Sequence, residues 1–313
     1  MKAKILLLDK NHPLIDEQLL AQGFVLDEDF SSSYDEVLKK INDYDGIIIR
    51  SRIPIDANFL NQAKNLKFIA RVGAGMENID GETAKALNIE LINSPEGNRD
   101  AVAEHVLGML LILMNRLFIA SNEVKNGIWL REENRGDELL GKTFGIIGYG
   151  NMGKSVAKRL SGFGVEVIFY DILPNIADEF ATQVSLEELQ KRADIVSLHI
   201  PLTDLTHYMI DENFISNMEK EFYFVNTARG KNLKTSALVE ALKSRKVKAA
   251  ALDVLEYEKS SFENLDVEND DLEYLLNSEN VIVTPHIAGW THQSKVKLAQ
   301  FIVDKILKLY NLE

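Results

Sequence analysis

A glycine-rich hexapeptide near the middle of the chain has the spacing of a dinucleotide-binding turn. Gly148, Gly150 and Gly153 follow the apolar run 144–147 and open a helical pattern, so the motif G-x-G-x-x-G stands between a strand and a helix. The first glycine permits a tight turn, the second lets a pyrophosphate approach the backbone, and the third lets the helix pack on the strand. Free N–H groups at the start of the helix would attract the phosphates.

An acidic residue closes the next predicted strand. Asp171 lies near the spacing of about 20 residues at which a carboxylate accepts hydrogen bonds from the adenosine ribose. Ile172 and Leu173 follow it, and no arginine stands nearby to pair with a 2′-phosphate. The pattern predicts NAD rather than NADP as the cofactor. The alternative is a glycine turn with a purely structural role.

Three residues of the C-terminal third could act on a hydroxy acid. Hydride transfer at a hydroxyl carbon needs a cation for the carboxylate, an acid–base group for the proton, and a neighbour that tunes the pKa of that group. Arg229, Glu258 and His286 each follow a predicted strand, where doubly wound sheets place their ligands. Taken singly, they could equally be a salt-bridging arginine, a loop glutamate and a histidine packed at a strand end.

Short apolar runs that alternate with amphipathic stretches must position these residues. In the first part of the chain they predict strands at 3–8, 24–26, 46–49, 68–70 and 90–92. The stretches between them predict helices at 13–22, 34–41, 57–63 and 79–87. A long helix is predicted at 99–120, and on it His105 is expected to form a hydrogen bond to another element.

A second series of the same kind begins at residue 142. Its predicted strands are 143–147, 165–169, 195–198, 222–226, 249–252 and 281–284. Its predicted helices are 152–163, 185–192, 213–217, 235–244 and 291–309, and the acidic segment 256–280 is predicted to be rich in loops. Strands that alternate with helices predict an α/β fold with doubly wound parallel sheets.

Composition excludes several classes of function. A chain of 313 residues fits two domains, and its net charge of -13 repels nucleic-acid backbones. The absence of cysteine excludes disulfides and thiolate chemistry and fits a reducing cytosol. The longest apolar stretch, 106–114, is too short for a membrane helix, and no histidines have metal-ligand spacing with carboxylates. We expect a cytoplasmic protein with a small-molecule substrate and no nucleic-acid, membrane or metal ligand.

The sequence resembles the D-isomer-specific 2-hydroxyacid dehydrogenase family over nearly its whole length. The resemblance is carried by residues 71–80, 93–98, 103–105, 148–153 with Asp171, 226–230, Asp253 with Glu258, and 285–289. It implies that Arg229 binds the substrate carboxylate and that His286 contacts the substrate as the acid–base group. It also implies that Glu258 pairs with His286 and raises the pKa of that histidine, so that the histidine can donate a proton during reduction.

The resemblance also implies a set of cofactor contacts. Asp253 matches the aspartate that contacts the nicotinamide carboxamide. The full set of matching positions is Gly148, Gly150, Asn151, Met152, Gly153, Asp171, Ile200, Thr227, Ala228, Asp253 and Gly289.

Residues near the N-terminus narrow the choice among hydroxy acids that could be the substrate. Ala74 and Gly75 match backbone amides that grip the substrate carboxylate in the family. Arg50 and Arg71 end two predicted strands, and matching arginines bind the phosphate in phosphoglycerate dehydrogenases of this family. We therefore favour a phosphorylated 2-hydroxy acid as the substrate. The arginines could instead bind carboxylates or acidic side chains, as other members of the family allow. The alternative function is then that of a hydroxypyruvate or glyoxylate reductase. A non-catalytic NAD-sensing protein of the same family is a further alternative.

The family resemblance predicts the domain organisation. It implies a Rossmann NAD-binding domain, residues 99–286, inserted in a flavodoxin-like substrate domain of residues 1–98 plus 287–313. The active site would lie in the cleft between the domains. The resemblance also implies a homodimer formed through the cofactor domains, with the regions 99–120 and 125–137 involved.

Overall fold

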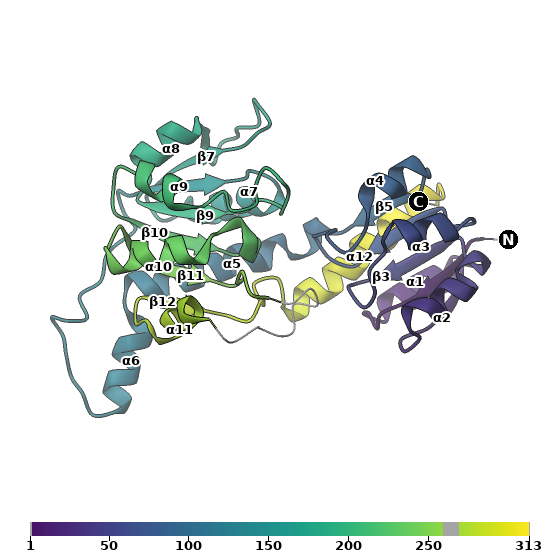
Figure 1. Ribbon diagram of the computed structural model, residues 1–313, viewed down its shortest axis with the longest axis horizontal. Coiled ribbons are helices and arrows are strands. Elements are labelled where there is room, and N and C mark those ends of the chain that lie inside the picture. The colour runs from purple at the N-terminus through teal and green to yellow at the C-terminus, as the bar shows by residue number, and fades with distance from the viewer. Residues whose placement is uncertain (1, 259–268, 313) are drawn as a thin grey trace. The chain divides into compact units, whose positions relative to one another are not determined.

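A computed structural model describes residues 2–258 and 269–312, and Figure 1 shows its α/β elements. The chain divides into two compact units. Unit 1 consists of Met1–Asn98 and Trp290–Glu313, and unit 2 of Arg99–Gly289. The chain thus returns to unit 1 at residue 290, whereas the sequence suggests 287. The division does not test which unit binds which ligand, so the assignment of unit 1 to the substrate and of unit 2 to the cofactor stays a prediction.

Unit 1 is built on a parallel sheet of five strands in the order β2-β1-β3-β4-β5. This order is flavodoxin-like and agrees with the predicted fold. The strands are β1 (Lys4–Leu7), β2 (Val25–Glu28), β3 (Gly46–Ile49), β4 (Phe68–Arg71) and β5 (Glu90–Asn93). The helices are α1 (Leu14–Ala21), α2 (Tyr34–Lys40), α3 (Ala57–Gln62), α4 (Gly81–Ala86) and α12 (His292–Leu309).

Both faces of this sheet are buried, which explains its continuous apolar strands. Ile5 and Leu7 of β1 pack in one cluster with residues of α1 and α12, including Ile302. The alternate residue Leu6 packs in a second cluster with residues of α2 and α3, including Phe59. Because side chains alternate along a strand, one short apolar run serves two cores.

Unit 2 contains a parallel sheet of seven strands in the order β12-β11-β10-β9-β6-β7-β8. The strand order reverses between β6 and β9, as in a Rossmann fold, and this also agrees with the prediction. The strands are β6 (Thr143–Ile147), β7 (Glu166–Tyr170), β8 (Thr182–Gln183), β9 (Ile195–Leu198), β10 (Phe222–Asn226), β11 (Val247–Leu252) and β12 (Val281–Val283). The helices that follow β6 in this unit are α7 (Asn151–Leu160), α8 (Leu186–Arg192), α9 (Glu212–Asn217), α10 (Thr235–Lys243) and α11 (Asp270–Asn277).

The prediction of one long helix at 99–120 is wrong, because two separate helices occupy this segment. Helix α5 spans Pro95–Met114, helix α6 spans Leu117–Lys125, and the two are bent by 60°. Arg116 between them has a φ of 51°, a left-handed conformation that side chains rarely adopt. No residue of α6 is buried, and Figure 1 shows this helix leaving the layers of unit 2.

Besides the short 3-10 helices Ile41–Asp43 and Gly230–Asn232, two smaller elements were not predicted. Residues 270–277 of the acidic segment form α11, which buries Leu272 and Leu275, so the expected loop is wrong there. The other is the two-residue strand β8. Residues 259–268 of the same segment lie outside the described residues. No single helix in the described part of the chain is long and apolar enough to cross a membrane, and α5 and α6 reach that length only as a bent pair.

The packing of unit 1 predicts that Gly46→Ala is destabilising. A Cβ on Gly46 would lie 2.2 Å from the buried Phe68 ring. Overpacking of this kind costs about 1–3 kcal/mol, and we expect a loss of that size in urea unfolding followed by circular dichroism. Gly162→Ala is the control, because a Cβ there meets nothing within 4 Å. Equal losses in the two variants would contradict the prediction.

Candidate active site

The glycine turn after β6 is shaped by close contacts at the point where the strand order reverses. Gly148 has a φ of 93°, and a Cβ there would lie 2.6 Å from the carbonyl oxygen of His199, which follows β9. A Cβ on Gly153 would lie 2.2 Å from the Gly148 oxygen, so only glycine lets α7 pack on the turn. Ile200 also packs against the turn, because its Cγ2 lies 2.7 Å from the same hypothetical Gly148 Cβ.

The start of α7 is suited to an anion. Gly150 is its N-cap residue and makes no side-chain capping bond. A Cβ on Gly150 would meet nothing within 4 Å, so the space beside it is open. Asn151 is exposed and Met152 half-buried in the first turn. The uncapped N–H groups and the helix dipole fit a pyrophosphate.

Asp171 is fixed to the glycine turn. Its Oδ2 accepts the Tyr149 N–H at 2.7 Å, and its Oδ1 accepts the Leu173 N–H at 2.9 Å. Because a carboxylate oxygen has two lone pairs, both oxygens can still accept a ribose hydroxyl. The turn and the ribose-binding candidate are therefore held as one piece.

Tyr149, inside the motif, was not identified from the sequence. Its ring is buried and stacks on Phe169, with centroids 3.8 Å apart. Its hydroxyl donates to Asp178 Oδ1 at 2.6 Å, and burial together with Asp178 raises the pKa of the phenol. Tyr149, at a position where the motif allows any residue, thus fixes the turn through its contacts with Phe169 and Asp178.

Two buried polar atoms near the turn lack partners among the described residues. They are His199 Nδ1 and Thr227 Oγ1, which follow β9 and β10. Burial lowers the pKa of His199 to about 3, so the ring is neutral near pH 7, and its Nε2 lies 2.9 Å from Ser197 Oγ. Buried polar groups need partners, and a bound dinucleotide would supply them. The turn, Asp171 and these atoms fit NAD.

A second group of residues stands on the loops that follow β10 and β11. Buried Asn226 accepts the Ala228 N–H at 3.0 Å and donates to the Arg229 carbonyl at 3.0 Å, which fixes this loop. Arg229 Nη1 donates to the Ala228 carbonyl at 2.6 Å. A Cβ on Gly230 would lie 1.9 Å from the Leu255 oxygen, so the two loops are in direct contact.

His286 and Glu258 form the predicted pair. His286 Nδ1 lies 2.8 Å from Glu258 Oε2, and the two side chains are 27% and 13% exposed. The other Glu258 oxygen accepts the Leu255 N–H. An ionised glutamate can only accept, so Nδ1 carries a hydrogen and Nε2 is the nitrogen left for proton exchange.

Asp253 holds the turn that carries His286. Its carboxylate, 1% exposed, accepts the N–H groups of Ile287 and Ala288, each at 2.8 Å, and the Thr284 hydroxyl at 2.6 Å. Its carbonyl accepts the His286 N–H at 2.8 Å. His286 itself has a φ of 56°, which this set of bonds maintains. Only one carboxylate lone pair remains for the predicted nicotinamide contact.

His105 extends this network from α5. Its Nε2 lies 3.1 Å from Thr284 Oγ1 and 3.5 Å from Asp253 Oδ1. Because the Thr284 hydroxyl donates its proton to Asp253, its lone pair faces His105, and Nε2 carries the hydrogen of that bond. No sequence pattern indicated the role of Thr284 in this network.

Four of the predicted substrate residues, Arg50, Arg71, Ala74 and Gly75, lie in unit 1, at or just beyond the carboxyl ends of β3 and β4. Arg71 Nε donates to the Arg50 carbonyl at 3.2 Å. Arg71 also lies across Gly73, where a Cβ would come within 2.2 Å of its Nη1. Among residues 2–258 and 269–312, the N–H groups of Ala74 and Gly75 donate no hydrogen bond. They are thus available to a carboxylate.

The predicted residues therefore fall into two groups. Arg50, Arg71, Ala74 and Gly75 belong to unit 1. The catalytic candidates, the cofactor candidates and Gly289 all belong to unit 2. No cluster of three His, Asp or Glu side chains within the described residues could hold a metal ion.

These features define a dinucleotide-dependent α/β dehydrogenase with a paired histidine and glutamate, and comparison with known proteins identifies its family. Residues 107–288 match the model of the D-isomer specific 2-hydroxyacid dehydrogenase NAD-binding domain. The chain is 38% identical over 274 residues to the hydroxypyruvate reductase of Thermotoga maritima, covering 88% of this chain and 87% of that protein. It is 37% identical over 281 residues to the D-3-phosphoglycerate dehydrogenase of Methanocaldococcus jannaschii, covering 88% of this chain and 51% of that protein.

A solved structure supports the same assignment. The D-lactate dehydrogenase of Aquifex aeolicus, solved with NAD and lactic acid, has a TM-score of 0.85 and 28% identity, covering 99% of this chain and 96% of that one. The chain belongs to the D-isomer-specific 2-hydroxyacid dehydrogenase family. It is an NAD-dependent D-2-hydroxyacid dehydrogenase. It spans about half the length of the phosphoglycerate dehydrogenase it matches.

The Asp253 network predicts that the Thr284 hydroxyl positions His286. Thr284→Val keeps the shape but leaves a buried carboxylate oxygen one bond short, so the turn should loosen. We expect kcat to fall roughly 10- to 100-fold, because small misplacements of a reacting group have effects of this size. Thr284→Ser keeps the hydroxyl and should stay within about threefold of the wild type. Equal kcat values for the two variants in an NADH-consumption assay would refute this role.

Proposed function

We propose that the enzyme is a D-3-phosphoglycerate dehydrogenase, which oxidises 3-phosphoglycerate to 3-phosphohydroxypyruvate in serine biosynthesis. The observation that carries this proposal is the pair Arg50 and Arg71. Strands β3 and β4 are neighbours, with Ile49 opposite Arg71, so both arginines stand at the same edge of the sheet. Two guanidinium groups at one edge suit a phosphate, which arginine binds through a planar fork.

The chemistry follows from the residues of both units. The glycine turn and Asp171 would hold NADH, which when bound would supply the hydride for reduction of the substrate carbonyl. His286 donates the proton of Nε2 to the carbonyl oxygen, and Glu258 stabilises the protonated imidazole through Nδ1. Binding of the substrate carboxylate is the role proposed for Arg229 and, separately, for the N–H groups of Ala74 and Gly75. In the direction of oxidation, neutral His286 accepts the hydroxyl proton.

A second candidate is the reduction of hydroxypyruvate or glyoxylate. It is favoured by the match to the Thermotoga maritima hydroxypyruvate reductase over 87% of that protein's length. Such substrates carry a carboxylate but no phosphate, so in this candidate Arg50 and Arg71 would not discriminate between phosphorylated and unphosphorylated acids.

We also propose a homodimer formed through an apolar arm, defined as α6 and residues 126–130. Its exposed apolar side chains are Leu117, Phe118, Val124, Ile128, Trp129 and Leu130. Phe118 and Trp129 are 71% and 75% exposed. Apolar patches of this kind mark protein interfaces. A second copy is the natural occupant, because most soluble oligomers are homo-oligomers with twofold symmetry.

The cytoplasmic location stays a prediction.

The substrate proposal predicts a selective loss of activity in arginine variants. Arg50→Gln and Arg71→Gln each remove a charged donor, worth about 1.5–3 kcal/mol. We expect kcat/KM for 3-phosphohydroxypyruvate to fall roughly 10- to 150-fold, and kcat/KM for glyoxylate to change less than about threefold. The measurement is NADH consumption by wild type and variants. If wild type prefers glyoxylate or hydroxypyruvate, or if both substrates lose equally, the second candidate replaces the first.

The dimer proposal predicts that charge in the arm dissociates the protein. We expect Phe118→Glu to sediment as a monomer at micromolar concentration, because a carboxylate would be buried at the interface without a partner. Leu20→Glu is the matched control, since Leu20 is 54% exposed on α1 in unit 1. It should leave the sedimentation coefficient unchanged. A monomeric wild type would overturn the proposal.

A further inference from the structure

An exposed tryptophan holds the side chain of Arg50. The guanidinium carbon of Arg50 lies 4.6 Å from the centroid of the Trp290 ring. Trp290 is 62% exposed, so the need to bury an apolar ring does not explain its place. Both residues belong to unit 1. At this distance the indole face attracts the guanidinium.

The backbone on each side of this contact is fixed. The Arg50 N–H donates to Asp9 Oδ2 at 2.6 Å, and its carbonyl accepts Arg71 Nε. Trp290 directly precedes Thr291, the N-cap of α12, which forms a capping box with Ser294. The contact between the two side chains therefore joins two anchored points of the backbone. It restricts the rotamers that each side chain can adopt.

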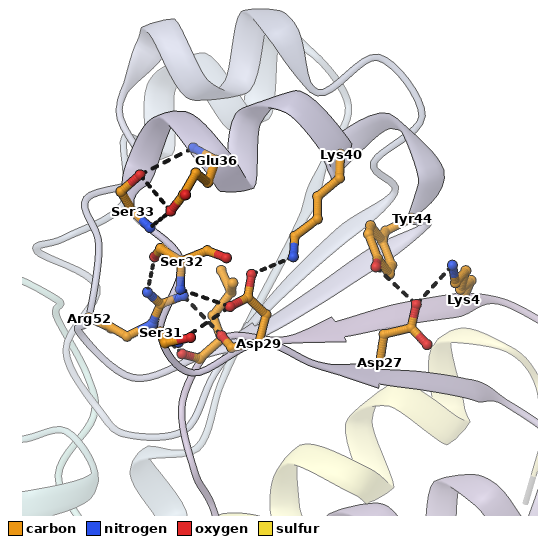
Figure 2. Close-up of polar contacts among 11 residues, drawn as sticks. Lys4, Asp27, Asp29, Ser31, Ser32, Ser33, Glu36, Lys40, Tyr44 and Arg52 are labelled. Atoms are coloured by element: carbon orange, nitrogen blue, oxygen red, sulfur yellow. Dashed lines mark hydrogen bonds and ion pairs between the residues drawn. The ribbon is translucent and has the colours of Figure 1, made fainter.

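A cation–π contact of this kind restrains a guanidinium without a hydrogen-bond acceptor, so it leaves the N–H donors for the oxygen atoms of an anion. Among residues 2–258 and 269–312, the Arg50 guanidinium donates no hydrogen bond. Its near neighbour Arg52 is the opposite case. Arg52 donates to the carbonyls of Leu8, Asp29 and Ser32, and Figure 2 shows it between the last two. The hydrogen bonds of the Arg52 guanidinium thus stabilise the fold, whereas the Arg50 guanidinium is oriented and can still donate to an anion.

We propose that Trp290 is a specificity-determining residue, which holds Arg50 with its N–H edges presented to the phosphate of the substrate. This inference rests on the proposed function of Arg50. Trp290 also lies four positions beyond His286 in the chain, so the residue that selects the substrate and the one that exchanges its proton share a segment.

The first test compares Trp290→Leu with Trp290→Phe. Leucine removes the aromatic face, and phenylalanine keeps a weaker one. We expect KM for 3-phosphohydroxypyruvate to rise about 5- to 10-fold in Trp290→Leu and about twofold in Trp290→Phe. Changes in kcat, and in KM for glyoxylate, should stay below about twofold. Thermal denaturation of each variant checks that the fold is kept.

A double-mutant cycle then asks whether Trp290 acts through Arg50. In the Arg50→Gln background, Trp290→Leu should have no further effect on KM. A further rise of the same size would overturn the inference, because Trp290 would then act independently. An unaffected KM in Trp290→Leu, beside a raised KM in Arg50→Gln, would also overturn it and leave the proposed function intact. An unaffected KM in Arg50→Gln would overturn both.

Fluorescence gives a readout that does not depend on turnover. The chain has 2 tryptophans, so Trp129→Phe leaves Trp290 as the sole indole. Titration of this variant with inorganic phosphate and with 3-phosphoglycerate should change the Trp290 emission saturably, and Arg50→Gln in the same background should abolish the change. A response that survives Arg50→Gln would contradict the assigned contact.

Discussion

A carboxylate buried at the end of β11 constrains the predicted active site. Asp253 is almost inaccessible to solvent, and a charge in such a place is tolerated only when its lone pairs are satisfied. The donors come from the turn after β12, two N–H groups and the Thr284 hydroxyl. The left-handed conformation of His286 costs on the order of 1–3 kcal/mol, and these charge-assisted bonds offset that cost. The acid–base candidate is thus placed by the need to satisfy a charge that does no proton transfer itself.

The glycine turn of the same sheet follows a similar logic. Only hydrogen atoms fit at Gly148 and Gly153, so the backbone of the turn, the end of β9 and the start of α7 come into direct contact. Tyr149 then locks the turn, because its buried hydroxyl needs Asp178 and its N–H needs Asp171. Preorganised donors hold an anion without losing conformational freedom on binding.

Local signals explain which parts of the structure the sequence could predict. Strands such as β3 and β9 are short, mostly apolar and flanked by polar residues, so the sequence predicts them readily. The family resemblance then supplied the Rossmann and flavodoxin-like folds. The break at Arg116 had no such signal, because the apolar spacing continues through it from Leu113 to Leu117. Helix α11 was missed because its acidic residues indicate a loop, while two leucines suffice to bury it. Thr284, Tyr149 and Trp290 depend on partners distant in sequence, and residue type alone does not reveal them.

The arginines of unit 1 show why residue type and position do not define an anion site. Arg50, Arg52 and Arg71 all stand at or just beyond strand ends. The Arg52 guanidinium, however, donates its hydrogen bonds to main-chain carbonyls, and Arg71 donates one to the Arg50 carbonyl. At physiological ionic strength a charge is screened beyond about 8 Å, so the net charge of -13 has little influence on a bound anion. At contact distance, an anion is bound by those cations whose N–H groups donate no other hydrogen bond and are held in a fixed orientation. By that measure Arg50 is the strongest candidate of the three, and the aromatic ring beside it supplies the orientation that a hydrogen bond would have supplied only by consuming a donor.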